Sequence, residues 1–463
     1  MIRLAASPQY RLCPGSRNPF TMSTTSSTSV ITPPRHSKGL KHNATVGLRA
    51  AARRPCRAAR MEGIPATRMC RFSKPMRLTH LSLYRFRTFP ELELDLPGGV
   101  VLLHGHNGAG KSNLLEACYL LAITKSYRAD NERELLSFQA RAPEEVPYVR
   151  VAGTVRHASG DDLTIQVDLL WRDDAVSSGA PGPLSKRIRV NGLPRRASDT
   201  LGVASAVLFT ADDIGVVTGP PSARRRFLDI LLCQLDQEYL RALQQYQRVL
   251  TQRNHLLRLL RDGQAQLDEM DFWDAELSKH GGLITARRAT LLGQMSEVAA
   301  GLYGDVASGR EALQLEYRPN LPCSADDPVA LGDAMLAMLA ESRRQEVAAG
   351  QTLTGPHRDD VSLTVSRISV AAYASRGQAR GVALALRLAE ARLIARLRGE
   401  EPVLLLDDIL SELDPPRRRQ VLAAAARADQ ALITAADRAQ FDDPTLEGAP
   451  RFLVASRTVT RES

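Results

Sequence analysis

The chain has 463 residues, 44% of them hydrophobic and 24% charged, which is typical of a globular protein with two or three compact units. No run of eighteen apolar residues lacks a charge, so we expect no membrane-spanning helix and a cytoplasmic protein. The six cysteines form no C-x-x-C pair, which argues against a zinc site or a disulfide framework.

The formal net charge of +10 suggests nucleic-acid binding until its distribution is considered. Residues 1–75 hold 14 of the 61 Lys and Arg residues but only one of the 51 acidic residues, Glu62. The remaining chain therefore has 47 basic and 50 acidic residues, a net charge of −3. A DNA-binding function must rest on local clusters of charge rather than on the total.

Residues 1–75 are rich in Ser, Thr, Arg and Pro and show no periodic apolar face. Such a composition is typical of a disordered tail. Two alternatives stay open: a spurious extension ahead of a translation start at Met76, or an organellar transit peptide.

The next segment carries the strongest motif of the chain. Alternating apolar residues predict strands around 81–84 and 92–96, and a third, apolar strand leads into Gly105-His-Asn-Gly-Ala-Gly-Lys-Ser112. A helical pattern follows from Leu114 to Leu121. A glycine-rich loop between a strand and a helix is the context that a phosphate-binding P-loop requires.

The residue types of this loop predict its chemistry. Backbone N–H groups would cradle the phosphates of ATP at Gly105, His106, Asn107, Gly108, Ala109 and Gly110. Lys111 would reach the β- and γ-phosphates, and the Ser112 hydroxyl would bind Mg²⁺.

Farther along, strands are predicted at 149–155 and 163–170, and a hairpin at 186–196 with a type I′ turn at Asn191–Gly192. The hairpin gathers five basic side chains, which are either a solvated surface or a contact to a phosphate backbone. These residues are Lys186, Arg187, Arg189, Arg195 and Arg196.

Residues 220–345 read as helical. Asp236–Arg261 is predicted to be one amphipathic helix of about 26 residues and about 40 Å. A turn at Asp262–Gly263 leads into a partner helix over Phe272–Val298, which we expect to be interrupted at Gly281–Gly282. Together they predict a helical lobe in the form of a short antiparallel arm.

The last third returns to α/β. A strand is predicted at 361–365, and Ser375-Arg-Gly-Gln378 opens a helix that runs to about Leu397. A strand then ends in Asp407–Asp408, where the first acid would hold the metal and the second would orient a water. The helix spans about 30 Å and the strand about 16 Å, so Ser375 and Gly377 would overshoot their own nucleotide and serve that of a second subunit.

Several motifs carry a resemblance to a known family. Four of them resemble the P-loop, signature, Walker B and D-loop of the SMC-like branch of ABC-type ATPases: Gly105–Ser112, Ser375–Gln378, Asp407–Asp408 and Ser411–Asp414. Four more resemble the RecF family of bacterial recombination mediators: Phe209–Asp213, Arg224–Asp229, Gln252–Asn254 and Thr354–Asp360. The resemblance covers about residues 76–455.

This resemblance implies an α/β fold, an ABC-type P-loop ATPase head with a helical second lobe. The head would comprise residues 76–219 and 346–463, and the lobe residues 220–345. It implies that Lys111 and Asp408 are catalytic, that Ser112 and Asp407 bind Mg²⁺, and that ATP is also bound by Ser375, Gly377, Gln378 and Asp414. Asp408 is one methylene shorter than the usual Glu, so we expect a weak ATPase with ATP as a dimerisation switch.

The implied function is an ATP-switched homodimer that binds double-stranded DNA and gapped junctions. It would help RecR and RecO to load RecA in DNA repair, replication and the SOS response. Thr434 stands in the position of a switch His, and Gln139 is a candidate Q-loop residue. Two alternatives are the nucleotide-binding subunit of an ABC transporter and a scaffold with vestigial nucleotide binding.

Overall fold

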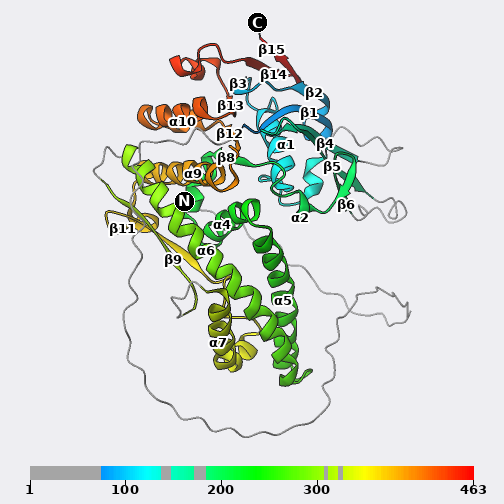
Figure 1. Cartoon of the computed structure of the whole chain (residues 1–463), viewed down its shortest axis with the longest axis vertical. Coiled ribbons are helices and arrows are strands. Elements are labelled where there is room, and N and C mark those ends of the chain that lie inside the picture. Colours follow the sequence, from blue (N-terminus) through cyan, green and yellow to red (C-terminus); the bar gives the residue numbers. More distant parts are fainter. Residues whose placement is uncertain (1–74, 137–147, 172–183, 307–310, 322–326, 463) are drawn as a thin grey trace, which may run out of the picture. The chain divides into compact units, whose positions relative to one another are not determined.

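Three β-sheets and the helices around them make up the described part of the chain, which comprises residues 75–136, 148–171, 184–306, 311–321 and 327–462 of a computed structural model (Figure 1). These residues belong to one unit spanning 63–463. Gln139, the candidate Q-loop residue, lies outside the described residues.

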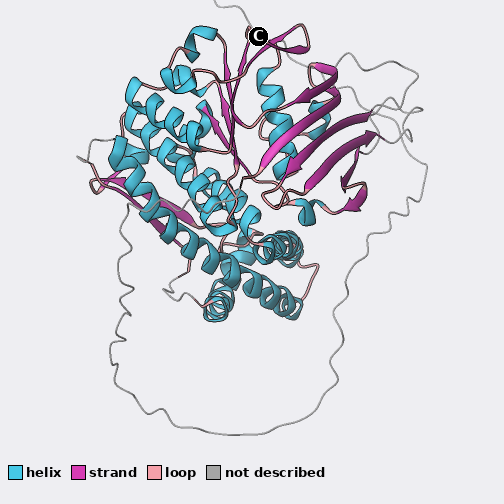
Figure 2. Ribbon diagram, turned by 45° about the horizontal axis from the view of Figure 1, so that its top comes forward, coloured by secondary structure: helices cyan, strands magenta, loops and turns pink. Residues whose placement is uncertain are grey.

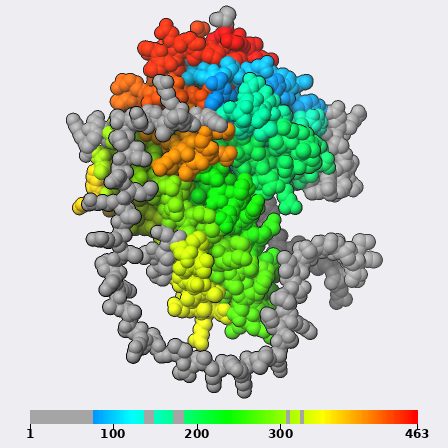
Figure 3. Space-filling view, in the orientation of Figure 1, coloured from blue at the N-terminus to red at the C-terminus, as the bar shows by residue number. Residues whose placement is uncertain are grey.

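The central sheet is almost entirely parallel. Its strand order is β8 (Ala206–Thr210), β12 (Val403–Asp407), β13 (Gln430–Ala435), β3 (Gly99–His104), β14 (Arg451–Ala455) and β15 (Thr458–Arg461), the last pair being antiparallel. The inner strands are apolar on both faces because helices cover both sides. The C-terminal strands therefore lie against N-terminal ones, as the red and blue atoms of Figure 3 show.

A second sheet is antiparallel, in the order β2 (Phe89–Asp95), β1 (Arg77–Phe86), β4 (Tyr148–Arg156), β5 (Asp162–Trp171), β6 (Leu184–Val190) and β7 (Leu193–Arg195). The helix α1 (Lys111–Ile123) packs between this sheet and the central one (Figure 2). The predicted hairpin is confirmed, with φ values of 50° at Asn191 and 76° at Gly192 as a type I′ turn requires.

The third sheet includes one strand that the sequence analysis did not predict. It has the order β11 (Ile368–Ser369), β10 (Asp360–Val365) and β9 (Leu313–Arg318). The predicted strand at 361–365 is confirmed as β10, but β9 lies in the segment that we expected to be helical. Its alternation of buried and exposed residues is too short to stand out between long helices.

The long helices are α4 (Pro221–Leu235), α5 (Gln237–Arg261), α6 (Met270–Val306), α7 (Pro328–Ala349) and α9 (Arg376–Arg398). The predicted helices at 236–261 and 375–397 are confirmed as α5 and α9. The lobe boundary predicted at residue 345 falls inside α7. The paired strands β9 and β10 lie on opposite sides of this boundary in the sequence. The division into lobes at 219 and 345 stays a prediction.

The expected interruption at Gly281–Gly282 is wrong, because α6 is continuous through both glycines. A Cβ at Gly281 would lie 2.4 Å from Sδ of Met335, and one at Gly282 would lie 2.3 Å from the carbonyl oxygen of Pro328. The two glycines therefore allow α7 to pack closely against α6 and do not break the helix.

Shorter elements connect these parts. They are α2 (Ala197–Thr200), α3 (Ile214–Thr218), α8 (Val370–Tyr373) and α10 (Pro415–Arg427), with 3₁₀ turns at Glu132–Leu135, Ala211–Asp213, Leu267–Glu269, Ile409–Glu412, Arg438–Phe441 and Pro444–Leu446. Within the described ranges, no helix has the length and apolar character needed to cross a bilayer. Cys118 and Cys233 are buried free thiols, and burial raises the pKa of each to about 12.

Candidate nucleotide site

The loop between β3 and α1 has a backbone that only glycine accommodates. Gly105, Gly108 and Gly110 have φ values of 152°, 81° and 112°. A Cβ at Gly105 would lie 2.1 Å from the carbonyl oxygen of Val454, whereas one at Gly108 would meet no atom within 4 Å. The first turn of α1 has no acidic residue, so the positive end of the helix is open to an anion.

Lys111 is enclosed by this loop. Its side chain is 7% exposed, and Nζ donates to the carbonyl oxygens of Gly105 at 2.6 Å and His106 at 3.1 Å. Burial lowers the pKa of Lys111, an effect opposed by the carboxylates of Asp408 and Asp407. The ammonium group is thereby fixed on the inner side of the loop, beside the two carboxylates.

Asp407 is the meeting point of three hydroxyl groups. Its Oδ1 accepts from Ser112 Oγ at 2.8 Å and from Thr434 Oγ1 at 3.1 Å, and its Oδ2 accepts from Tyr127 at 2.8 Å. The arrangement follows from the sheet order, because β12, β13 and β3 are adjacent and parallel and their carboxyl ends share one edge. A carboxylate and a hydroxyl suit Mg²⁺, which takes oxygen ligands and completes its shell with water and phosphate.

These residues fit a magnesium–nucleotide pair better than a metal held by protein alone. Among the described residues, no group of three or more His, Cys, Asp or Glu side chains is placed to bind a metal. Mg²⁺ in nucleotide sites is usually held by one or two carboxylates together with substrate phosphates.

Asp408 has a strained backbone and an unsatisfied side chain. Its φ is 49°, and its backbone N–H donates to Thr434 Oγ1 at 2.9 Å. Its Oδ1 is buried and has no hydrogen-bond partner among the described residues. Burial raises the pKa of Asp408, opposed by Lys111. Strain of this kind is concentrated at functional sites, and a buried oxygen without a hydrogen-bond partner is a second feature typical of them.

Sequence reasoning missed Tyr127, which lies just after α1. The hydroxyl of Ser126 donates to buried Glu116 and accepts from the backbone N–H of Arg128 at 3.0 Å. This anchor turns the Tyr127 ring toward Asp407, with an edge-on contact to Tyr119 at 5.5 Å between ring centroids. The only indication of this role in the sequence was that Tyr127 follows soon after the P-loop helix.

The signature residues form a second cluster at the start of α9. Ser375 caps the helix: its Oγ accepts from the N–H of Gln378, and Gln378 Oε1 accepts from the N–H of Ser375, both at 3.1 Å. A Cβ at Gly377 would meet nothing closer than 3.8 Å. No neighbour among the described residues therefore requires glycine at this exposed turn, and the space leaves room for a ligand to approach the backbone.

Asp414 belongs to this second cluster. It caps α10, accepting from the N–H of Arg417 at 3.1 Å, and it pairs with the Arg417 guanidinium, which lies beside Gly377. Across the described ranges, no hydrogen bond or ion pair links the second cluster to the P-loop. The structure thus joins the P-loop to Asp407 and Asp408, and it groups Ser375, Gly377, Gln378 and Asp414 in a second cluster without a described hydrogen bond to the first.

In the segments that resemble the RecF family, charged side chains link elements that lie far apart in the sequence. The side chain of Arg253, which is fully buried, pairs with Asp274 and Glu346, and Arg288 pairs with Asp229. Arg224 and Arg225, considered above only as part of a motif, are likewise engaged: Arg224 binds Asp360 at 2.7 and 3.0 Å, and Arg225 donates to the Asp359 carbonyl oxygen at 2.7 Å.

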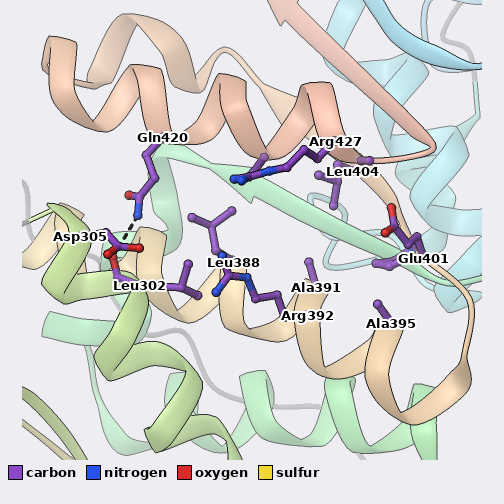
Figure 4. A pocket seen from close by; sticks show the side chains of 13 residues that line it. Leu302, Asp305, Leu388, Ala391, Arg392, Ala395, Glu401, Leu404, Gln420 and Arg427 are labelled. Carbon is purple, nitrogen blue, oxygen red and sulfur yellow. Dashed lines mark hydrogen bonds between the residues drawn. The ribbon is translucent and has the colours of Figure 1, made fainter. Parts of the chain in front are cut away.

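A cavity of about 230 Å³ lies between α9, α10 and the C-terminal end of α6 (Figure 4). Arg392 and Arg427 stand on either side of an apolar floor that includes Leu388 and Ala391. None of the residues lining it belongs to the P-loop or to the signature cluster, so this cavity is separate from the nucleotide site.

Comparisons with known proteins agree with this geometry. The family model for the RecF/RecN/SMC N terminal domain matches residues 77–446. The DNA replication and repair proteins RecF of Chloroflexus aurantiacus and Roseiflexus castenholzii are each 41% identical, over 82% of this chain and 98% of theirs. A solved structure of the recombination mediator protein RecF with ATP, from the RecFOR pathway, is 28% identical with a TM-score of 0.75, covering 86% of this chain and all of that one. The chain therefore belongs to the RecF family and has the α/β fold of an ABC-type ATPase.

Proposed function

We propose that this protein is an ATP-switched DNA-binding protein of replication and recombinational repair. The observation that carries the proposal is the division of the nucleotide machinery into two clusters within one chain. The P-loop cluster has the groups needed to bind a triphosphate and a metal, and the signature cluster presents an exposed helix N-terminus. Relatives called DNA replication and repair protein RecF support the assignment to DNA.

In the P-loop cluster, the loop N–H groups and Lys111 would bind the triphosphate of ATP, and Ser112 and Asp407 would hold Mg²⁺. The metal, when bound, supplies positive charge that offsets the charge of the phosphates. Asp408 would orient a water through its free Oδ1. Because Asp is shorter than Glu, we expect slow hydrolysis, with Lys111 and Asp408 as the catalytic residues.

The signature cluster would close the nucleotide site of a second copy. The N-terminus of α9 carries no acidic residue in its first turn, so its dipole favours phosphate. Ser375, Gly377 and Gln378 would contact the γ-phosphate of the partner's ATP, and Asp414 would lie at the same interface. ATP would thereby control dimerisation, and dimerisation would control DNA binding.

Light scattering tests the dimer. Lys111→Ala removes the P-loop cation and Ser375→Arg blocks the signature turn, so each variant alone should stay monomeric with ATP and Mg²⁺. An equal mixture should recover some dimer, because one of its two sites combines an intact P-loop with an intact signature. Gln264→Arg, at the exposed turn between α5 and α6, is the matched control and should dimerise normally. Undiminished dimers of both single variants would contradict the two-subunit site.

The DNA partner and the wider pathway are part of the same proposal. We infer that the ligand is double-stranded DNA next to a single-stranded gap and that RecR, RecO and RecA act with this protein, including in the SOS response, because its relative is a recombination mediator of the RecFOR pathway. Filter binding to gapped duplex over a salt series, with and without ATP, tests this step. A flat salt slope and no effect of ATP would count against it. No observation favours a transporter subunit or a vestigial scaffold.

A further inference from the structure

The exposed face of α5 is basic and amide-rich. No acidic residue occurs between Arg241 and Arg261. The side chains exposed on this face between Arg241 and Gln252 are Arg241, Gln244, Gln245, Gln247, Arg248, Thr251 and Gln252. The opposite face, which includes Tyr246 and Leu257, is buried against the neighbouring helices. The face thus presents hydrogen-bond donors without a carboxylate.

This face forms one wall of a groove. The other wall is Arg196–Asp199, where the β6–β7 hairpin leads into α2, and the space between them measures about 1170 Å³. The groove continues into a cavity of about 520 Å³, because Ser198, Gln244 and Gln247 line both. The cavity ends at basic residues of the segment after α1 and of α4, namely Lys125, Arg225 and Arg226.

The basic residues of this groove differ in how far they are already engaged. Arg225 donates to Asp359, and two further basic residues of the hairpin are also bound within the chain: Lys186 pairs with Glu132, and Arg189 pairs with Asp168. Arg288, which lines the cavity, pairs with Asp229. Five other basic side chains of the groove and cavity make no ion pair or side-chain hydrogen bond with any residue that the structure describes. These are Lys125, Arg196, Arg226, Arg241 and Arg248.

Few acidic groups offset this charge. Asp229 is paired with Arg288, and Asp199, which is exposed and accepts from the neutral Ser198 hydroxyl, keeps its negative charge. Five unpaired cations therefore face one unpaired carboxylate. The two aromatic residues, Tyr119 and Tyr246, are buried. An unpaired basic wall with amide donors suits phosphate oxygens, which only accept hydrogen bonds, and the lack of exposed rings disfavours stacking of unpaired bases.

We propose that this groove binds the sugar–phosphate backbone of duplex DNA, without sequence preference, along one strand. The exposed face from Arg241 to Gln252 is about 16 Å long, enough to contact several backbone groups of one strand. The inference rests on the proposed DNA-binding function. It adds which surface binds DNA and which form of DNA is bound.

The test is fluorescence anisotropy of the full chain with a labelled 30-base-pair duplex, ATP and Mg²⁺, over a salt series. The double variant Arg241→Gln/Arg248→Gln removes two charges from exposed helix positions. We expect duplex binding about tenfold weaker or more, and a log–log salt slope smaller by about two. The control Arg258→Gln/Arg261→Gln makes the same charge change on the same helix beyond the groove and should bind like the unmodified chain.

The outcomes separate this inference from the proposed function. If the unmodified chain binds no DNA, the proposed function fails. If it binds duplex and the groove variant matches it in affinity and slope, the groove assignment alone is overturned. Equal weakening in both variants, or a loss confined to single-stranded DNA, would overturn the groove assignment as well. ATP binding by the groove variant, measured separately, should be unchanged.

Discussion

Arg253→Met tests whether the Gln252–Asn254 segment stabilises the fold. The guanidinium of Arg253 is fully buried and binds Asp274 at 2.7 Å, Glu346 at 2.7 Å and Thr352 at 2.8 Å. Methionine preserves most of the apolar stem but removes all three contacts. Asp274 keeps Arg343 as a partner, whereas Oε2 of Glu346 loses its ion-pair partner in the interior. Removing one member of a buried ion pair costs about 3–5 kcal/mol, so we expect a loss of that size in the free energy of unfolding.

Urea unfolding is the assay, followed by circular dichroism and by the fluorescence of Trp273, which lies next to Asp274 on α6. Arg258→Met on the same helix is the control. Its side chain is exposed and, among the described residues, donates only to the carbonyl oxygen of Asn254, so the substitution should change stability by about 0.5 kcal/mol or less. Adding Glu346→Gln to Arg253→Met should recover part of the loss, because no buried charge is then left without its partner. A loss below about 1 kcal/mol for Arg253→Met would refute the reasoning.

Two further predictions concern the nucleotide site and pH. Tyr127→Phe keeps the ring contact with Tyr119 but removes the hydroxyl that donates to Asp407. A hydrogen bond to a charged group contributes about 1.5–3 kcal/mol. The Mg²⁺ concentration needed for ATP binding should therefore rise by about tenfold or more. An unchanged Mg²⁺ titration would contradict the role given to Tyr127. Burial lowers the pKa of His357 to about 4, assisted by Arg358, Arg225 and Arg253, so between pH 6.5 and 4 the unfolded state binds a proton that the folded state does not. Stability should therefore fall by up to about 3 kcal/mol as the pH drops through this window, and unfolding of His357→Gln should lack this component; an identical pH profile for both proteins would rule it out.

The engaged arginines show why a basic motif is a weak guide to binding. Arg224 and Arg225 are adjacent in a run of three, yet both are bound within the chain, and only Arg226 is exposed. Their partners Asp360 and Asp359 lie more than 130 residues away. Local sequence predicts where charge is dense, but the availability of a charge depends on which carboxylates and carbonyl groups the fold places beside it.

Patterns confined to short stretches were sufficient for the P-loop, the strands that precede it and Asp407, the Asn191–Gly192 turn and the helices α5 and α9. Each depends on backbone geometry or periodicity that neighbouring residues impose. The tertiary structure alone decided the rest. It made Gly281 and Gly282 a packing surface for α7, paired β9 with the distant β10, and set Tyr127 against Asp407. These contacts join residues far apart in the chain, and their energies depend on packing and burial that no local pattern records.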